Sequence, residues 1–225
     1  MLAAMNTLRH YAAPLALLPV LYAALVAACS PYGTASPPGS VLFQDDFSRL
    51  SSGWASEHTS EAIREYRDGQ YVVLILAPDT SIWSTPGLDL GPVRLDVDAQ
   101  QIGGPQDNLY GLICRYQNDA NFVFLAASSD GFAGIGEVRD GERRMISGGA
   151  MLPADSIAPL GYANHLTAEC LDESLRLSVN GTLVAEAASH ASSMGDVGLI
   201  VGSYAEAGIE IAFDSFSVRV PELSP

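Results

Sequence analysis

Four turn-forming dipeptides constrain the fold of this chain more than any other feature of its sequence. They are Asp68-Gly69, Asp130-Gly131, Asp140-Gly141 and Asn180-Gly181. Asp-Gly and Asn-Gly readily adopt the positive φ values that two-residue hairpin turns require, and each dipeptide separates two runs rich in β-branched or aromatic residues. The sequence therefore predicts a domain built from antiparallel β-hairpins.

The expected strands are short, and almost no helical periodicity is present beyond residue 40. We expect strands over 65–67, 71–76, 93–98, 121–125, 132–138, 144–146, 175–179, 183–185, 197–201 and 209–220. In the last run the apolar positions change parity between Phe213 and Phe216, which predicts a bulge or kink that keeps both rings on one side. About a dozen strands need two packed sheets. The expected fold class is therefore an all-β, antiparallel two-sheet sandwich.

The N-terminal residues 1–28 have the layout of a secretory signal: Arg9 with no acid, an apolar run over 15–28, and small residues at its end. The run is shorter than the ~20 residues that span a bilayer, and Pro19 interrupts it, which argues against a retained transmembrane helix. It ends in Val26-Ala27-Ala28-Cys29, which resembles the lipobox of bacterial lipoproteins. That resemblance implies cleavage before Cys29 and lipidation of Cys29. The alternative is a chance cysteine in an ordinary signal.

The expected domain organisation follows from this anchor. Residues 29–40 are rich in Pro, Gly and Ser and cannot bury a core, so they predict a flexible tether between the membrane and a sandwich domain over 41–221, with a short tail over 222–225. The predicted location is the bacterial cell envelope, on the outer face of a membrane. The membrane is then a partner through the lipid anchor alone.

The net charge excludes some partners. The formal charge is −15 at neutral pH, and every basic residue except histidine is an arginine. A strongly acidic surface repels phosphate backbones and anionic lipid headgroups. We therefore expect no nucleic-acid partner and no docking of the protein surface on anionic lipid.

Beyond Cys29, the only cysteines are Cys114 and Cys170. Each lies in a strand-like run, and counting by twos places both side chains on the apolar face of their strands. In an exported protein two such thiols are expected to form a disulfide. Two separate buried thiols are the alternative.

Several segments, taken in order, resemble the concanavalin A-like lectin/glucanase jelly-roll domains, and within them the subgroup of 3-keto-disaccharide hydrolase-type domains found on bacterial lipoproteins. The resemblance covers residues 41–220, and it implies that the first and last strands lie side by side. The segments are Phe43-Gln44-Asp45-Asp46-Phe47-Ser48, Gly53-Trp54, Asp68-Gly69-Gln70-Tyr71, the run 108–116, Val179-Asn180-Gly181 and Ala212-Phe213-Asp214-Ser215-Phe216.

Jelly-roll glucanases of this kind carry acids on one strand face, typically in the pattern Glu-x-Asp-x-x-Glu, because retaining cleavage needs carboxyl groups about 5 Å apart. The nearest match is Glu137, Asp140 and Glu142, but Asp140-Gly141 is a turn, so these acids straddle a hairpin end. Asp96 and Asp98 share a strand face without a third acid, and a solvated acidic face explains them. We therefore predict no catalytic residues.

The sequence predicts neither a metal site nor a catalytic triad. His58, His165 and His190 are scattered, so they predict neither a zinc site nor a triad. Asp45, Asp46 and Asp214 lie in segments that could hold a structural calcium ion, but capping and turn hydrogen bonds explain them better. We expect no cofactor and no metal.

Candidate ligand-binding residues fall into two groups. On the strand faces opposite the two cysteines, four polar side chains are expected to face solvent, where they either bind a ligand or form surface ion pairs: Arg115, Thr167, Glu169 and Arg176. Trp83, in an expected loop over 79–84, and Tyr110 and Tyr116 are candidates for stacking on a sugar ring, although the two tyrosines are also candidates for the core. The binding set is Trp83, Tyr110, Arg115, Glu169 and Arg176.

The leading function hypothesis is a non-catalytic surface lipoprotein whose jelly roll binds a carbohydrate or a surface protein. The alternative is a glycoside-cleaving enzyme of the keto-disaccharide hydrolase or glucanase type, which the resemblance implies and for which Asp96 and Arg115 are the residues to test. A purely structural envelope component is a third hypothesis.

Overall fold

The computed structural model describes residues 36–189 and 192–222. The expected signal peptide, Cys29 and His190 lie outside these residues, as do most of the tether and the end of the tail. The described residues contain no α-helix, and so none that is long and apolar enough to cross a membrane. They form sixteen strands: β1 (Val41–Asp45), β2 (Glu57–His58), β3 (Ala62–Arg67), β4 (Gln70–Ile75), β5 (Ser81–Ser84), β6 (Val93–Gly103), β7 (Asn108–Asn118), β8 (Asn121–Ser128), β9 (Phe132–Arg139), β10 (Glu142–Met145), β11 (Leu152–Pro153), β12 (Ala163–Cys170), β13 (Ser174–Val179), β14 (Thr182–Ala188), β15 (Asp196–Ser203) and β16 (Glu210–Arg219).

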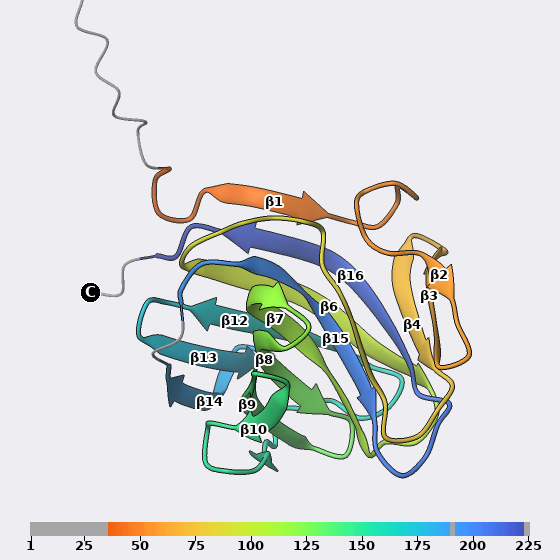
Figure 1. Cartoon of the computed structure of the whole chain (residues 1–225). Coiled ribbons are helices and arrows are strands. Elements are labelled where there is room, and N and C mark those ends of the chain that lie inside the picture. Colours follow the sequence, from red (N-terminus) through yellow and green to blue (C-terminus); the bar gives the residue numbers. More distant parts are fainter. Residues whose placement is uncertain (1–35, 190–191, 223–225) are drawn as a thin grey trace, which may run out of the picture. The chain divides into compact units, whose positions relative to one another are not determined.

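The strands form two antiparallel sheets that pack face to face (Figure 1). The nine-stranded sheet has the order β14-β13-β12-β6-β16-β4-β3-β2, with β1 paired to β16. The seven-stranded sheet has the order β10-β9-β8-β7-β15-β5, with β11 paired to β9. The predicted all-β sandwich is confirmed. The first and last strands also lie side by side, with Phe43 opposite Val218.

Three of the four turn dipeptides form the predicted two-residue turns. Asp68, Asp140 and Asn180 all have φ between 52° and 54°, and the glycine after each is also positive. Asp130-Gly131 differs, because only Gly131 has a positive φ and Ser128 pairs with Phe132 across a longer loop. This loop still reverses the chain between β8 and β9, so the predicted hairpin is present with another turn geometry.

The predicted irregularity in the last strand is a bulge at Ser215. Its φ is 54°, and the register of β16 against β6 shifts between Asp214 and Ser217. The extra residue lets Phe213 and Phe216 both point into the core, where each is almost fully buried.

The core lies between the sheets and is built from alternate residues of the facing strands. At one end it is aromatic: the ring of Trp54 lies 5.5 Å from that of Phe47 and 5.0 Å from that of Phe216. The buried Asp45 carboxylate accepts hydrogen bonds from the Phe47 amide at 2.9 Å and from the Trp54 indole at 2.8 Å. Trp54 is therefore a core residue, and both oxygens of Asp45 have partners within the fold.

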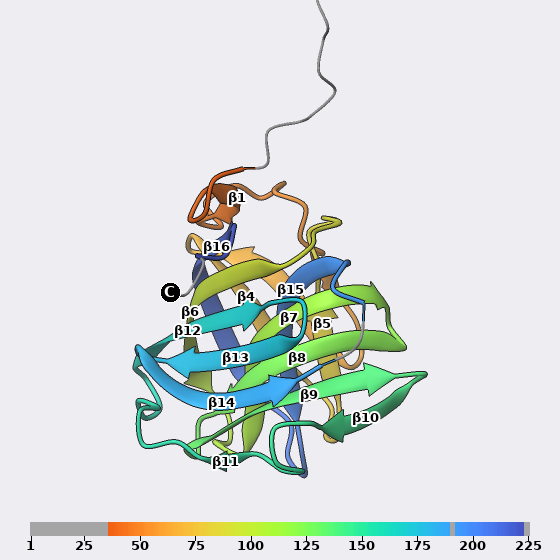
Figure 2. The ribbon, with the colours of Figure 1, turned by 90° about the vertical axis from the view of Figure 1, so that its left-hand side faces the viewer.

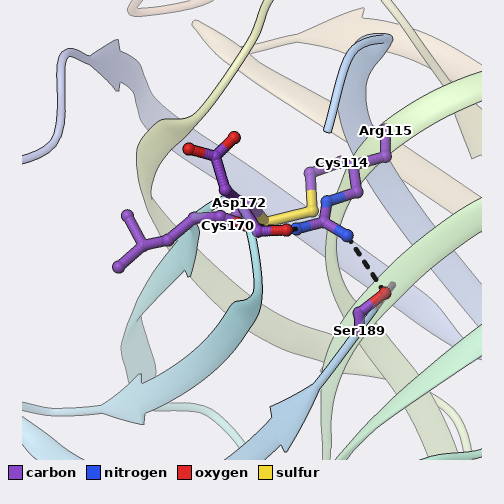
Figure 3. Close-up of a disulfide and its surroundings, with 6 residues drawn as sticks. Cys114, Arg115, Cys170, Asp172 and Ser189 are labelled. Carbon is purple, nitrogen blue, oxygen red and sulfur yellow. Dashed lines mark hydrogen bonds between the residues drawn. A yellow bond between two sulfur atoms is a disulfide. The ribbon is translucent and has the colours of Figure 1, made fainter. Parts of the chain in front are cut away.

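The predicted disulfide is present and links the two sheets (Figure 3). Cys114 lies on β7 of the seven-stranded sheet and Cys170 on β12 of the nine-stranded sheet, with Cα atoms 6.7 Å apart. Both sheets, the bridge and the whole core belong to the compact unit over residues 36–225. This unit contains every strand of both sheets, so we expect it to fold without residues 1–35.

Candidate functional site

The outer face of the nine-stranded sheet is charged and internally paired. Arg94 donates to both oxygens of Asp96 at 3.0 and 3.1 Å, and His165 lies 2.7 Å from Asp98. Burial raises the pKa of Asp96, but hydrogen bonds from Arg94 and Thr167 outweigh it and hold that pKa below its ordinary value. Asp96 and Asp98 share a strand face as predicted, yet Asp96 is an anion held by its neighbours rather than an acid poised for proton transfer.

Two of the predicted binding residues, Glu169 and Arg176, lie on this same charged face. Arg176 lies 4.0 Å from Glu169 and 2.9 Å from Glu186. These side chains are partly exposed, and ion pairs near the surface contribute little to stability. Of the two roles left open by the sequence, ligand binding or surface ion pairs, Glu169 and Arg176 therefore have the second.

The expectation that Arg115 faces solvent beside Glu169 and Arg176 is wrong. Arg115 has a φ of 56° at a bulge in β7, where the register against β8 shifts after Cys114. The bulge breaks the alternation of faces, so counting by twos from Cys114 fails at the very next residue. Arg115 is only 4% exposed. It therefore does not join a surface cluster with the residues of the nine-stranded sheet.

The Arg115 guanidinium instead reaches across to the nine-stranded sheet, as Figure 3 shows. It donates to the carbonyl oxygens of Leu171 and Asp172, which follow Cys170, and to the Ser189 hydroxyl at 3.0 Å. Burial lowers the pKa of Arg115, against the opposing effect of the Asp172 charge. Arg115 thus reinforces the contact between the sheets that the disulfide makes.

Tyr110 is also placed in the core rather than on a binding surface. Its side chain points between the sheets, and its hydroxyl accepts a hydrogen bond from the Asn164 amide at 3.0 Å. Burial raises its pKa to about 12, partly offset by hydrogen bonds to Ser129 and Asn164. Of the two roles that the sequence left open for Tyr110, the structure selects the core.

Trp83 lies elsewhere, on the outer face of the seven-stranded sheet. The expected loop over 79–84 contains strand β5, in which Trp83 pairs with Ile200 of β15. Around it is a second apolar cluster, separate from the core, which we call the aromatic face. Its buried members are Leu109, Ile113, Phe122, Phe124, Ala126 and Ile200, and its partly buried members are Trp83, Tyr116, Val138, Met145 and Met151.

The aromatic face is concave. Arg143, on the edge strand β10, lies with its guanidinium 4.5 Å from the centre of the Phe124 ring and donates to the hydroxyl of Ser81 on the opposite edge strand β5 at 3.0 Å. Four strands lie between β10 and β5, so in a flat sheet these two strands would be about 24 Å apart. That distance is much greater than one arginine side chain can reach. The sheet therefore curls over this face; Figure 2 shows β8, β9 and β10 in succession along it.

Glycines in β9 make room for the side chains on this face. A Cβ at Gly136 would lie 2.1 Å from the Phe124 ring, and one at Gly134 would lie 2.6 Å from the end of the Met145 side chain. Phe124 and Met145 therefore lie directly on the backbone of β9. Any larger residue at these two positions would displace them.

Beside these filled positions lies an aromatic platform made of Trp83, Tyr116 and Phe122. The Trp83 ring is 5.0 Å from Phe122, and the Tyr116 ring is 5.9 Å from it. One oxygen of Asp119 accepts hydrogen bonds from the Trp83 indole at 2.9 Å and from the Tyr116 hydroxyl at 2.7 Å. Burial and the Asp119 acceptor raise the pKa of Tyr116, so its hydroxyl stays a neutral donor. Asp119 fixes both rings in one orientation.

Next to Arg143 the aromatic face opens into a pocket of about 430 Å³. It is lined by Leu109, Arg143, Arg144, Met145, Gly149 and Tyr204. Its size is that of a small-ligand site, and its lining combines apolar surface with a few polar groups. The platform and the pocket together make this concave face the best candidate for ligand binding among the residues that the structure describes.

The acids that resemble a glucanase motif do not share one strand face. Glu137 is buried in β9 on the side away from the aromatic face, where Arg139 and Arg144 pair with it. Asp140 forms the turn to β10, as predicted, and Glu142 lies beyond it.

The candidate calcium ligands hold turns. Asp46 accepts from Ser48, Asp214 accepts from the Ser215 amide, and Asp45 is occupied in the core. Within residues 36–189 and 192–222, no three histidine, cysteine or acidic side chains are grouped to hold a metal ion.

The sequence interpretation missed Asp119, Phe122 and Arg143. One signal for the aromatic face was present: the run 121–125 is apolar at every position after Asn121, whereas a strand with one solvated face alternates. That pattern indicates a strand covered on both sides. Arg143 gives no such signal, because its role depends on the curl of the sheet.

The two packed sheets have the concanavalin A-like jelly-roll fold. No protein-family model matches the chain, and no curated protein matches it in sequence. Among solved structures, a carbohydrate-binding module from Bacillus subtilis is similar with a TM-score of 0.51 and 16% identity, over 76% of this chain and 92% of that one. A protein of unknown function with a galectin-like fold, also from Bacillus subtilis, has a TM-score of 0.59 and 12% identity over 83% and 99%. A β-glucanase from Bacillus licheniformis has a TM-score of 0.58 and 9% identity over 84% and 100%. At these identities the likeness establishes the fold.

Proposed function

We propose that this protein is an exported, lipid-anchored, non-catalytic carbohydrate-binding protein, and that its aromatic face holds the sugar. The observation that carries the proposal is the platform of Trp83 and Tyr116, whose orientation Asp119 fixes on a concave sheet face. Rigid aromatic rings with a polar edge present apolar surface for the C–H face of a sugar ring while keeping hydrogen-bonding groups at its rim. The carbohydrate-binding module and the glucanase with the same fold support this choice of ligand.

The non-catalytic part of the proposal rests on the acids. Glycoside hydrolysis needs two carboxyl groups about 5 to 9.5 Å apart that flank the bond to be cleaved. Asp119, at the edge of the aromatic face, accepts hydrogen bonds from Trp83 and Tyr116, and Glu137, on the other side of β9, is held in ion pairs by Arg139 and Arg144. Asp96 and Arg115, the residues of the enzyme hypothesis, lie on different sheets and are held by their own neighbours.

Binding is tested with the unit over residues 36–225 on a panel of immobilised oligosaccharides and polysaccharides. We expect Trp83→Ala to abolish the binding that the native unit shows, because it removes one of the three rings of the platform. Tyr162→Ala is the matched control, since Tyr162 is 67% exposed and lies outside the aromatic face. If no carbohydrate binds, or if both variants bind like the native unit, the proposed site is wrong. Release of reducing ends from a bound glycan would disprove the non-catalytic role.

Lipid anchoring is tested separately with the full chain expressed in a bacterium. The supporting feature is the tetrad ending in Cys29 after an apolar run. We expect the chain to incorporate labelled fatty acid and to partition into detergent, and we expect Cys29→Ser to lose both properties. A native chain that is exported but enters the aqueous phase unlabelled would show that Cys29 is not lipidated.

A further inference from the structure

Arg143 has an unusual environment for an arginine in so acidic a chain. The formal charge is −15, and most arginines of the described residues contact a carboxylate. Arg139 of β9 and Arg144 of β10 both form ion pairs with Glu137. Arg143 has no carboxylate partner within residues 36–189 and 192–222; its contacts there are the Phe124 ring and the Ser81 hydroxyl.

The pocket beside Arg143 is positively charged. Arg143 and Arg144 both line it, but the Arg144 guanidinium is bound to Glu137 on the other side of the sheet, so the charge comes from Arg143. The other lining residues (Leu109, Met145, Gly149 and Tyr204) carry no negative charge at neutral pH. In a protein of opposite net charge, a concave site lined by apolar surface and by one guanidinium group that pairs with no carboxylate of the described residues provides a local positive potential. That potential favours a ligand with its own negative charge.

We propose that this pocket binds the carboxylate of an acidic saccharide, a uronic acid residue, and that Arg143 is the residue that selects it. The inference rests on the carbohydrate-binding function proposed above and names the class of sugar. The aromatic platform holds the sugar rings, and the pocket takes the charged substituent.

The geometry of Arg143 suits this role. Its Nη1 donates to Ser81, and among the described residues no hydrogen-bond acceptor is bound at its Nε and Nη2. Nε and Nη2 form one edge of the planar guanidinium, and that edge matches the two oxygens of a carboxylate. The Phe124 ring beneath and the Ser81 hydroxyl at one end hold the plane in place, so little conformational freedom is lost on binding.

The experiment compares uronic acid oligosaccharides with their own methyl esters on the unit over residues 36–225. Oligomers of galacturonate, glucuronate and mannuronate are each tested in both forms by calorimetry. The methyl ester keeps the sugar and its linkage but has no charge. We expect at least one acidic oligomer to bind about tenfold or more tightly than its ester, as for a hydrogen bond to a charged group.

Three variants assign the effect. Arg143→Gln is expected to remove the difference between acid and ester, and Arg143→Lys to restore only part of it, because lysine keeps the charge without the planar fork. Arg176→Gln, on the charged outer face of the other sheet, is the control and is expected to keep the difference. Urea unfolding of each variant verifies that it is folded.

The outcomes distinguish the selection of a carboxylate from carbohydrate binding itself. If neutral sugars or methyl esters bind as tightly as the acids, the selection of a carboxylate is wrong while carbohydrate binding stands. If sulfated sugars bind and uronates do not, the class of acid is wrong. If no saccharide binds, charged or neutral, both proposals fail.

Discussion

The disulfide between Cys114 and Cys170 should provide a large share of the stability of this sandwich. The bridge closes a loop with a sequence separation of 56 residues. In the chain-entropy model, a loop of that length destabilises the unfolded state by about 4 kcal/mol at 25 °C. Folded domains are stable by only about 5–15 kcal/mol, so opening the bridge should remove a substantial part of that free energy of unfolding.

The assay is equilibrium urea unfolding of the unit over residues 36–225, followed by tryptophan fluorescence. With an m-value of about 2 kcal/mol/M, a loss of 4 kcal/mol lowers the midpoint by about 2 M. The double variant Cys114→Ala/Cys170→Ala removes the bridge together with two sulfur atoms from the core. The native unit with its bridge reduced keeps both sulfur atoms, so it isolates the effect of the cross-link.

A midpoint that falls by less than about 0.5 M in the reduced native unit would refute the reasoning. It would mean that the unfolded chain is already compact enough for the bridge to restrict it little. If the double variant alone lost stability, the bridge would act through packing in the core rather than through chain entropy. The native unit, the reduced unit and the double variant therefore distinguish the effect of the cross-link from the effect of the sulfur atoms on core packing.

Three further predictions follow from the contacts described above. Gly136→Val should lower the free energy of unfolding by about 1–3 kcal/mol, measured in urea, because its side chain collides with Phe124; an unchanged midpoint would show that the ring moves freely. Asp119→Ala should change stability by less than about 0.5 kcal/mol yet weaken carbohydrate binding several-fold, measured by calorimetry, because it releases the two platform rings; unchanged affinity would exclude a positioning role. Burial raises the pKa of Tyr71 and of Tyr110 to about 12, so their contribution to stability is complete below about pH 10 and is lost as the pH rises toward 12; urea midpoints at pH 9 and pH 11 measure it, and Tyr71→Phe should reduce the loss.

Local turn chemistry made most of the fold predictable. Asp68-Gly69, Asp140-Gly141 and Asn180-Gly181 form the expected turns because the positive φ is a property of the dipeptide itself. The parity change before Phe216 located the bulge in β16 for a similar reason, since the core accepts only one face of the strand. Strand β5 was taken for a loop because it is four residues long and pairs with β15 alone.

The binding face was much less predictable, because it depends on where the chain departs from regular alternation. Arg115 was assigned to solvent by counting from Cys114, but the bulge between them turns its side chain toward Leu171. Trp83 was recognised as a candidate, although its partners Asp119 and Phe122 come from a hairpin that is distant in sequence. Residue counting cannot bring such segments together, because the curl of the sheet is a property of all its strands at once.

The packing of the aromatic face and its proposed role in binding are compatible. An open concave sheet lined with Phe122 and Phe124 would expose a large apolar patch, which soluble proteins normally avoid. The Arg143 guanidinium covers Phe124 and bridges to Ser81, so part of that patch is closed without a ligand. The same bridge uses Nη1 alone and leaves the Nε and Nη2 edge for a carboxylate. One arginine can therefore keep the unbound face soluble and still recognise an acidic sugar, since the two roles use different atoms of its guanidinium.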